Sequence, residues 1–183
     1  MSGIILAFKR FNYTDGIFGS PWVGLENFRF FFIGGKALSV TLNTFTYNLQ
    51  FIVTNTTMAI LVAVIFSEIK ARYFKKIAHS IIFLPYFITW VVVSAFIYNI
   101  FNYEFGALNT FLHSIGREPL NVYTNIGVWR YILIGSHIWK NVGYASIVYL
   151  AAITGIDHEL FEAASIDGAS IFQRIRYITL PSI

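Results

Sequence analysis

The apolar residues of this chain are gathered into three long blocks. No Asp, Glu, Lys or Arg occurs over residues 41–67 or 77–101, and residues 131–156 contain only Lys140. A bilayer core about 30 Å thick is spanned by roughly 20 helical residues, so each block is long enough to cross it with some tilt. Helices are expected because a lipid-exposed strand edge would leave backbone groups unpaired. The pattern predicts an all-α integral membrane protein, a polytopic bundle with at least three transmembrane helices, at about residues 41–67, 77–101 and 128–153.

The composition agrees with this class and excludes others. Hydrophobic residues make up 56% of the chain and charged residues only 12%, about half the charged share of a soluble domain. With no cysteine, neither a disulfide nor a thiolate metal site can form. The net charge of +4 fits basic loops held in the cytoplasm. No basic patch is interleaved with stacking aromatics, so nucleic-acid binding is not expected.

One short loop orients the predicted helices. Residues 68–76 hold four basic side chains between two apolar blocks: Lys70, Arg72, Lys75 and Lys76. Loops that dense in positive charge stay in the cytoplasm. Residues 1–39 then lie outside, residues 40–153 form the membrane core, and residues 154–183 lie inside. The total of Lys and Arg is equal on the two sides, so this orientation depends on the density of one loop.

Both ends of the chain resemble interrupted membrane segments. Residues 1–8 are apolar but too short to span, and they lack the features of a signal peptide. We expect them to be the end of a preceding membrane helix, followed by turns at the extracytoplasmic surface. The chain stops just after Pro181. Because proline commonly begins a helix, a further membrane helix is expected to follow.

The most specific motif lies near the C-terminus. Its fixed positions are Glu162, Ala163, Ala164, Gly168, Ile178, Leu180 and Pro181. Small side chains that precede a glycine tolerant of left-handed backbone predict a short helix, a turn and a second helix. Glu162, expected near the start of the first helix, suits the positive end of its dipole and can pair with a partner's Arg. The motif predicts a helix–turn–helix elbow at the cytoplasmic face.

The spacing of this motif resembles the EAA loop of binding-protein-dependent ABC importer permeases. Residues 20–28, SPWVGLENF, and residues 139–144, WKNVGY, are similar to segments of the carbohydrate, maltose-type permeases. The similarity is closest to the branch of the lipoprotein-associated oligosaccharide transport permease. The resemblance implies the type I ABC importer permease fold and a place in the bacterial cytoplasmic membrane. It also implies four kinds of partner: a second permease, an ABC ATPase dimer, an extracytoplasmic solute-binding protein, and a sugar or oligosaccharide.

The resemblance also implies roles for the motif residues. In this family the elbow is the coupling helix, which sits in a cleft of the ATPase and moves when the ATPase dimer closes on ATP. Glu162, Ala163, Ala164 and Gly168 would then form the coupling contact. Asp167, Leu180 and Pro181 would shape the elbow.

Polar side chains inside the predicted helices are candidates for a substrate path. The candidates are Asn48, Asn55, Trp139, Lys140, Asn141 and Tyr144. Asn48 and Asn55 are seven positions apart and share a helix face, where interhelical hydrogen bonds are the alternative. Lys140 lies mid-helix, where a charge usually faces protein or water, and a structural ion pair is its alternative. His79 and His137 are isolated on apolar helices, so we expect both to pack in the core.

Catalysis finds no support in the chain. Residues 34–36 are Gly-Gly-Lys, but position 30 is not Gly and Ala37 stands where a phosphate loop has Ser or Thr. No nucleophile motif, metal-spaced His pair or cofactor site appears, so the ATPase is expected in another chain. Two rival hypotheses remain: a non-functional fragment of such a permease, and a secondary transporter. A secondary transporter would need intramembrane ion sites and no docking elbow.

Overall fold

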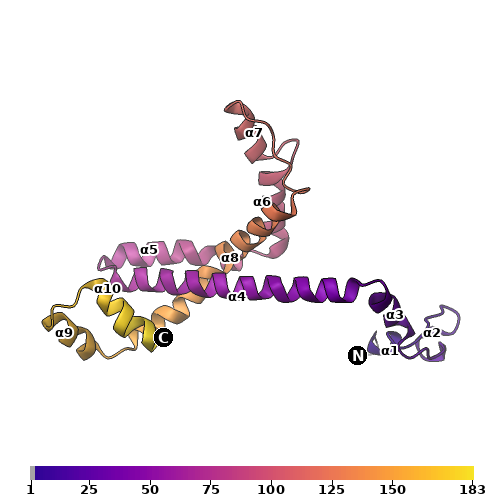
Figure 1. Cartoon of the computed structure of the whole chain (residues 1–183), viewed down its shortest axis with the longest axis horizontal. Coiled ribbons are helices and arrows are strands. Elements are labelled where there is room, and N and C mark those ends of the chain that lie inside the picture. The colour runs from indigo at the N-terminus through magenta and orange to yellow at the C-terminus, as the bar shows by residue number, and fades with distance from the viewer. Residues whose placement is uncertain (1–2) are drawn as a thin grey trace. The chain divides into compact units, whose positions relative to one another are not determined.

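The fold is helical throughout the part of the chain that the structure describes. The computed structural model describes residues 3–183, with the backbone alone at residue 30. Within these residues the only β-type pairing is an isolated bridge between Lys9 and Trp22, and all regular elements are helices (Figure 1). The predicted all-α class is therefore confirmed. The chain forms two compact units, Met1–Leu49 and Gln50–Ile183, which are described separately.

The first unit is a set of short helices joined by turns. It contains α1 (Gly3–Leu6), α2 (Gly16–Gly19), α3 (Glu26–Ile33) and the first part of α4 (Lys36–Glu68). Of the expected end of a preceding helix, Met1 and Ser2 lie outside the described residues, and α1 covers part of the remainder. Lys9 is buried, and its Nζ donates to the carbonyl oxygens of Ile17 and Phe18 at 3.2 and 2.6 Å.

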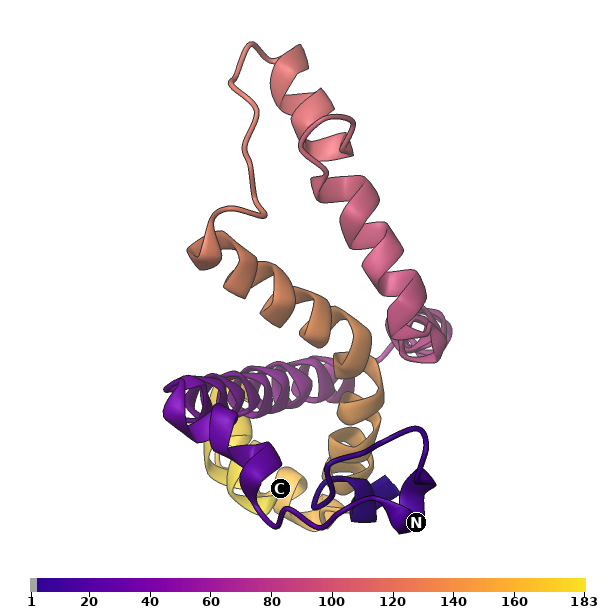
Figure 2. The same cartoon turned by 90° about the vertical axis from the view of Figure 1, so that its right-hand side faces the viewer.

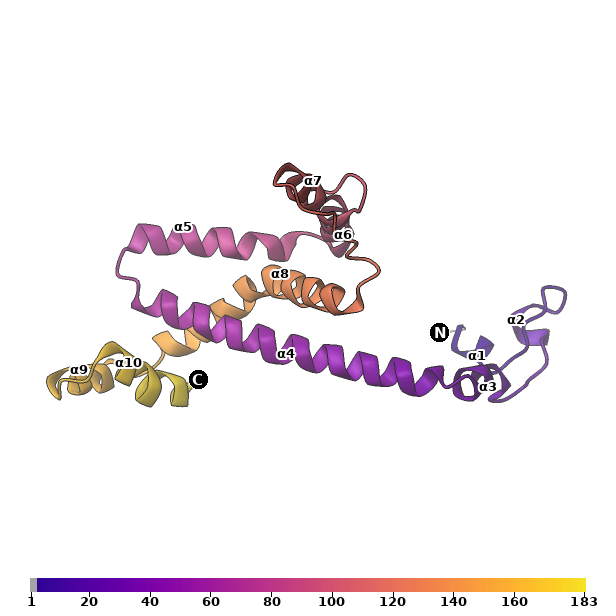
Figure 3. The same ribbon diagram turned by 45° about the horizontal axis from the view of Figure 1, so that its top comes forward.

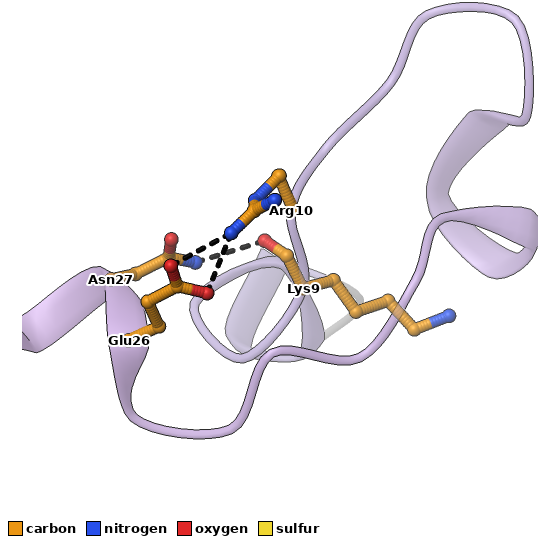
Figure 4. Close-up of polar contacts among 4 residues, drawn as sticks. All are labelled: Lys9, Arg10, Glu26 and Asn27. Atoms are coloured by element: carbon orange, nitrogen blue, oxygen red, sulfur yellow. Dashed lines mark hydrogen bonds and ion pairs between the residues drawn. The ribbon is translucent and has the colours of Figure 1, made fainter.

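Two residues of the SPWVGLENF segment, Glu26 and Asn27, form hydrogen bonds that stabilise the first unit (Figure 4). The Arg10 guanidinium donates to both carboxylate oxygens of Glu26 at 2.7 Å. The Asn27 amide donates to the carbonyl oxygens of Ala7 and Lys9 at 3.0 and 2.9 Å. These contacts tie the start of α3 to the segment that follows α1. The polar residues of the segment therefore have a structural role of their own.

Helix α4 covers the first predicted span, residues 41–67. Among the described residues it is the single helix long and apolar enough to cross a membrane by itself. Helix α8 (Ile126–Thr154) covers the third predicted span and has 29 residues, but it does not reach the same apolar limit. Polar residues such as His137, Lys140 and Asn141 lower its hydropathy. Length and composition thus identify one spanning helix, or two if a bent pair counts as one, against the three expected.

The second predicted span, residues 77–101, is not one continuous helix. The chain forms α5 (Arg72–Phe83), the short 3-10 helix η1 (Leu84–Phe87) and α6 (Trp90–Phe101), and the two arms are bent by 98°. Pro85 lies at the start of η1 and has no N–H to continue the α-helical hydrogen bonds, although Leu84 before it keeps helical backbone, with φ of −53° and ψ of −43°. Ile88 and Thr89 are extended, with ψ of 130° and 151°. The predicted continuous helix is therefore wrong: the chain leaves helical geometry at Ile88 and Thr89, after the 3-10 turn that contains Pro85.

The remaining elements follow α6 and α8. They are α7 (Ala107–Ser114), α9 (His158–Ile166), α10 (Ile171–Arg174), the π-helix η2 (Ile175–Thr179) and the 3-10 helix η3 (Leu180–Ser182). Figure 2 shows α7 continuing beyond α6 and an irregular segment returning to α8. The buried side chain of Asn109 holds this irregular segment in place. Its amide donates to the Tyr103 and Leu120 carbonyl oxygens at 3.1 Å, and its Oδ1 accepts from the Leu120 N–H at 2.8 Å.

The core of the second unit lies where the end of α4 meets α5 and α8 (Figure 3). Its buried members are Ala63, Val64, Phe66, Leu150 and Ile153. Fully buried Ala59 and Ala63 are small, which allows neighbouring helices to approach closely. The His79 ring stacks on Phe66 at 4.6 Å and the His137 ring on Phe51 at 4.5 Å. Both histidines thus pack against an aromatic ring, but each is only half-buried and neither belongs to the core cluster, so the core position predicted for them is wrong.

Candidate functional site

The C-terminal elbow is built from two capped helices and a tight turn. Asp157 begins α9, with its Oδ1 accepting from the Glu159 N–H at 3.0 Å. The helix ends in a left-handed glycine, Gly168, with φ of +78°. The Ala169 N–H donates to the Ala164 carbonyl oxygen at 2.9 Å, which is the bond that closes a Schellman turn. The helix–turn–helix elbow expected from the motif spacing is thus present.

The second helix of the elbow begins with a capping box. The Ser170 N–H donates to Gln173 Oε1 at 2.8 Å, and the Gln173 N–H donates to Ser170 Oγ at 3.3 Å. This reciprocal pair satisfies two backbone donors at the helix start. The Arg174 Nη1 donates across the elbow to Ser165 Oγ at 2.9 Å. Both ends of the turn are therefore held by side chains of the elbow itself.

The motif residues occupy different environments within the elbow. Glu162 and Ala163 are exposed and Ala164 is half-buried; Asp167, Gly168, Leu180 and Pro181 are exposed. Glu162 is in the second turn of α9, so its expected position at the positive end of the helix dipole was wrong. Glu159 lies in the first turn instead. Glu162 Oε1 lies 4.0 Å from His158 Nδ1 at the surface, where a partner can reach it.

The elbow is connected to the helical core. After α10 the chain continues through η2, where Thr179 is buried. Ile175 and Ile183 pack against the core cluster around Ala63 and Leu150. Packed elements of this kind move as a body rather than bending. A displacement of α9 would therefore be transmitted to the ends of α4 and α8.

A second candidate site is a groove beside the helix break. It has a volume of about 500 Å³ and is lined by polar and aromatic side chains: Asn55, Tyr86, His137, Asn141 and Tyr144, with neighbouring residues of α8. The rings of Tyr86 and Tyr144 stack with centroids 4.6 Å apart. Asn55 Oδ1 is buried with no hydrogen-bond partner among the described residues. The groove therefore offers an aromatic face next to an acceptor that lacks a donor.

Three of the six substrate-path candidates line this groove, and the other three do not. Asn55, Asn141 and Tyr144 line the groove. Asn48 is exposed in the first unit, and its amide donates to the Thr44 carbonyl oxygen of its own helix at 2.8 Å. Trp139 lies on another side of α8, against apolar residues of α6. Sequence reasoning missed Tyr86 as a groove residue; the overlooked signal was its place directly after Pro85.

Lys140 has a role that sequence reasoning did not anticipate. It is buried, and its Nζ donates to the Tyr86 carbonyl oxygen at 2.8 Å. The ammonium also lies 5.5 and 5.7 Å from the ring centroids of Tyr86 and Trp90. The ion pairs described within residues 3–183 join Arg10 to Glu26 and His158 to Glu162, so the expected ion pair of Lys140 is not found. Lys140 instead caps a carbonyl that the helix break leaves open.

We predict that Lys140→Met destabilises the protein at the helix break. The change keeps an apolar stem of similar length but removes the donor to the Tyr86 carbonyl oxygen, and an unsatisfied buried acceptor costs about 1–3 kcal/mol. The apparent Tm of the purified protein in detergent should fall by several degrees, measured by intrinsic fluorescence. Arg117→Met, on an exposed loop residue, is the matched loss of one positive charge. An equal Tm for the two variants would contradict the capping role.

Comparison with known proteins identifies the chain. The family described as "Binding-protein-dependent transport system inner membrane component" matches residues 55–183, which include the groove and the elbow. The chain belongs to this family. A bacterial ABC transporter that imports the acidic polysaccharide alginate has a crystal structure that superimposes with a TM-score of 0.84 and 34% identity, over 99% of this chain and 60% of that one. The type I ABC permease fold is thereby shown.

Curated members of the transport family agree with this assignment. The polygalacturonan/rhamnogalacturonan transport system permease protein YteP of Bacillus subtilis (strain 168) is 35% identical over 100% of this chain and 57% of its own length. Protein LplB of the same organism is 28% identical over 100% of this chain and 58% of its own length. The chain thus spans less than two thirds of the length of these relatives. The family places it in a membrane.

Proposed function

We propose that this chain is part of the permease subunit of an ATP-driven importer for a sugar or oligosaccharide. The observation that carries the proposal is the capped elbow of α9 and α10, which presents Glu162 and Ala163 at the surface and packs onto the core through η2. The relatives are named as transport permeases, which agrees with the expectation of a transport subunit rather than an enzyme. ATP hydrolysis would reside in a partner chain.

The elbow would couple the ATPase to the translocation path. Closure of an ATPase dimer would push on the exposed face of α9, and the packing of Ile175 and Ile183 would carry the motion to the core. Rigid-body motion of packed helices is the ordinary means of such switching. A second permease would complete the path, giving alternating access across the cytoplasmic membrane in a multi-pass assembly.

The groove beside the helix break is the proposed part of the substrate path. Stacked aromatic rings suit the apolar faces of sugar rings, and the amides of Asn55 and Asn141 suit hydroxyl groups. The unpartnered Oδ1 of Asn55 would accept a hydrogen bond from a sugar hydroxyl. A solved alginate transporter is described in complex with a periplasmic protein that holds an alginate pentasaccharide. An extracytoplasmic solute-binding protein is accordingly a proposed partner here.

Contacts at one end of the second unit support the proposed orientation. Residues of the basic loop, Glu68, Lys70 and Lys75, line the same pocket as His158 and Arg174 of the elbow. The loop and the elbow therefore belong on the same side of the membrane. Since a loop so rich in basic residues stays in the cytoplasm, the elbow would face the cytoplasmic ATPase.

Site-directed cross-linking tests the coupling role. Residues 1–183 contain no cysteine, so Ala164→Cys would place on the elbow the one thiol of this part of the protein. Co-expressed with an ATPase that carries a cysteine in its docking cleft, it should form a disulfide whose yield changes when ATP is added. Ser114→Cys, at the end of α7 between the second and third predicted spans and so on the opposite side of the membrane from residues 68–76, is the control and should not cross-link.

The outcomes separate this proposal from its two rivals. No cross-link from Ala164→Cys, with correct membrane insertion, would remove the ABC importer role. Sugar uptake that persists without any ATPase would then favour a secondary transporter. A nucleotide-independent cross-link without uptake would favour a non-functional fragment.

A further inference from the structure

A second polar pocket lies where four helices end or begin. It has a volume of about 400 Å³ and is formed by the end of α4, the start of α5, the end of α8 and the elbow. In Figure 1 the beginning of α5, the end of α4 and the elbow helices α9 and α10 gather at the same end of the second unit. Its lining combines apolar residues such as Ile153 and Ile156 with charged side chains.

The charges around this pocket are predominantly positive. Lys70, Lys75 and Arg174 line it together with a single acid, Glu68. None of these four belongs to the ion pairs described within residues 3–183. Lys75 and Arg174 are half-buried, so part of their hydration is lost without a compensating carboxylate. Positive side chains gathered in this way favour an anionic ligand.

One buried atom of a residue that lines the pocket lacks an acceptor. Arg174 donates through Nη1 to Ser165 Oγ at 2.9 Å, but its Nε is buried and has no hydrogen-bond partner in the described part of the chain. A buried donor left unpaired is costly, and guanidinium N–H groups match the geometry of phosphate oxygens. Ser67 and Thr154 add hydroxyl groups to the same lining. The missing acceptor and the local charge both indicate an oxyanion.

We propose that this pocket binds the phosphate of an anionic membrane phospholipid. It lies at the end of α4, the helix long and apolar enough to span a membrane, where headgroup phosphates meet protein. Basic pockets between membrane helices on the cytoplasmic side bind anionic headgroups such as that of cardiolipin. Apolar Ile153 and Ile156 would contact the glycerol and the first acyl carbons. This inference rests on the proposed cytoplasmic position of the elbow.

The lipid would join two elements that move in the proposed mechanism. Lys70 belongs to the connection between α4 and α5 and Lys75 to the first turn of α5, whereas Arg174 belongs to the elbow. A phosphate held by both would stabilise one position of the elbow against the membrane core. The coupling contact would then depend on the anionic lipid content of the membrane.

Lipid binding by the complete purified protein tests the inference. Native mass spectrometry in detergent would follow titration with cardiolipin, with phosphatidylcholine and with inorganic phosphate. Cardiolipin should bind at a few equivalents and phosphatidylcholine should not compete with it. Lys75→Gln and Arg174→Gln should each weaken cardiolipin binding about tenfold, since each removes a charged donor.

The chain offers matched controls for both variants. Lys76→Gln removes the same charge from an exposed neighbour outside the pocket lining and should change binding less than twofold. Ser165→Ala removes the elbow bond of Arg174 but keeps the guanidinium, which distinguishes loss of a ligand contact from loss of elbow structure. Tm values of all variants would show which of them fold.

Several results would overturn the inference. Equal effects of Lys75→Gln and Lys76→Gln would mean that cardiolipin binds through general surface charge and not in this pocket. Displacement of cardiolipin by millimolar inorganic phosphate, with phosphate binding lost in Arg174→Gln, would mean a site for free phosphate. The Ala164→Cys cross-link is measured on the same preparations. Cross-linking without selective lipid binding overturns only this inference, and selective lipid binding without cross-linking overturns only the coupling proposal.

Discussion

Gly143→Ala is expected to destabilise the protein more than any other one-carbon substitution in α8. A Cβ at this position would lie 2.6 Å from the Ile82 carbonyl carbon and 2.8 Å from Phe83 Cα, closer than atoms can approach. These are backbone atoms of α5, so no side-chain rotation relieves the clash, and the two helices must separate. Overpacking of this kind costs about 1–3 kcal/mol. The apparent Tm in detergent should fall by roughly 2–12 °C.

The control for this prediction lies on the same helix. A Cβ added at Gly135 would have no heavy atom within 4 Å. Gly135→Ala should therefore keep or slightly raise the Tm, because alanine stabilises a helix by about 0.5–1 kcal/mol relative to glycine. The close approach at Gly143 also sets Tyr144 against Tyr86 in the groove. Sugar uptake should therefore fall in Gly143→Ala and persist in Gly135→Ala. Equal Tm values for the two variants would show that α5 and α8 do not pack so closely.

Gly168→Ala is expected to impair coupling while leaving the fold intact. Gly168 has φ of +78°, and a Cβ added there would have no heavy atom within 4 Å. The cost of the substitution therefore comes from the left-handed backbone alone. That conformation costs about 1–2 kcal/mol for a residue with a Cβ. Strain of this size would depopulate the elbow geometry about 5- to 30-fold. ATP-dependent sugar uptake in membrane vesicles should fall accordingly, while the Tm should fall by no more than about 2–8 °C.

A comparison with asparagine identifies the cause. Asparagine tolerates left-handed backbone better than alanine although it is larger. If the backbone conformation is what matters, Gly168→Asn should retain more uptake than Gly168→Ala. The reverse order would mean that close approach of the ATPase requires the small residue, and the conformational account of Gly168 would be rejected.

Much of the architecture was readable from local patterns. Blocks with few or no charged residues predicted the positions of α4 and α8, because burying charge in lipid is costly wherever the block is placed. The elbow followed from the spacing around Gly168, since a left-handed glycine ends a helix by local sterics. The interruption within residues 77–101 also has a local signal in Pro85, which lacks an N–H, although the chain leaves helical geometry only at Ile88 and Thr89; the apolar run concealed this signal.

What the sequence determined by itself was the helical membrane class, the family-like motif and the elbow, all of which depend on residues close together in the chain. Only the tertiary structure showed that Lys140 caps the Tyr86 carbonyl and that Asn55 shares a groove with Asn141, while Trp139 faces elsewhere. These outcomes depend on how α4, α5 and α8 rotate against one another. That rotation follows from small-residue contacts such as Gly143 on Ile82, which join residues far apart in the chain and have no local signature.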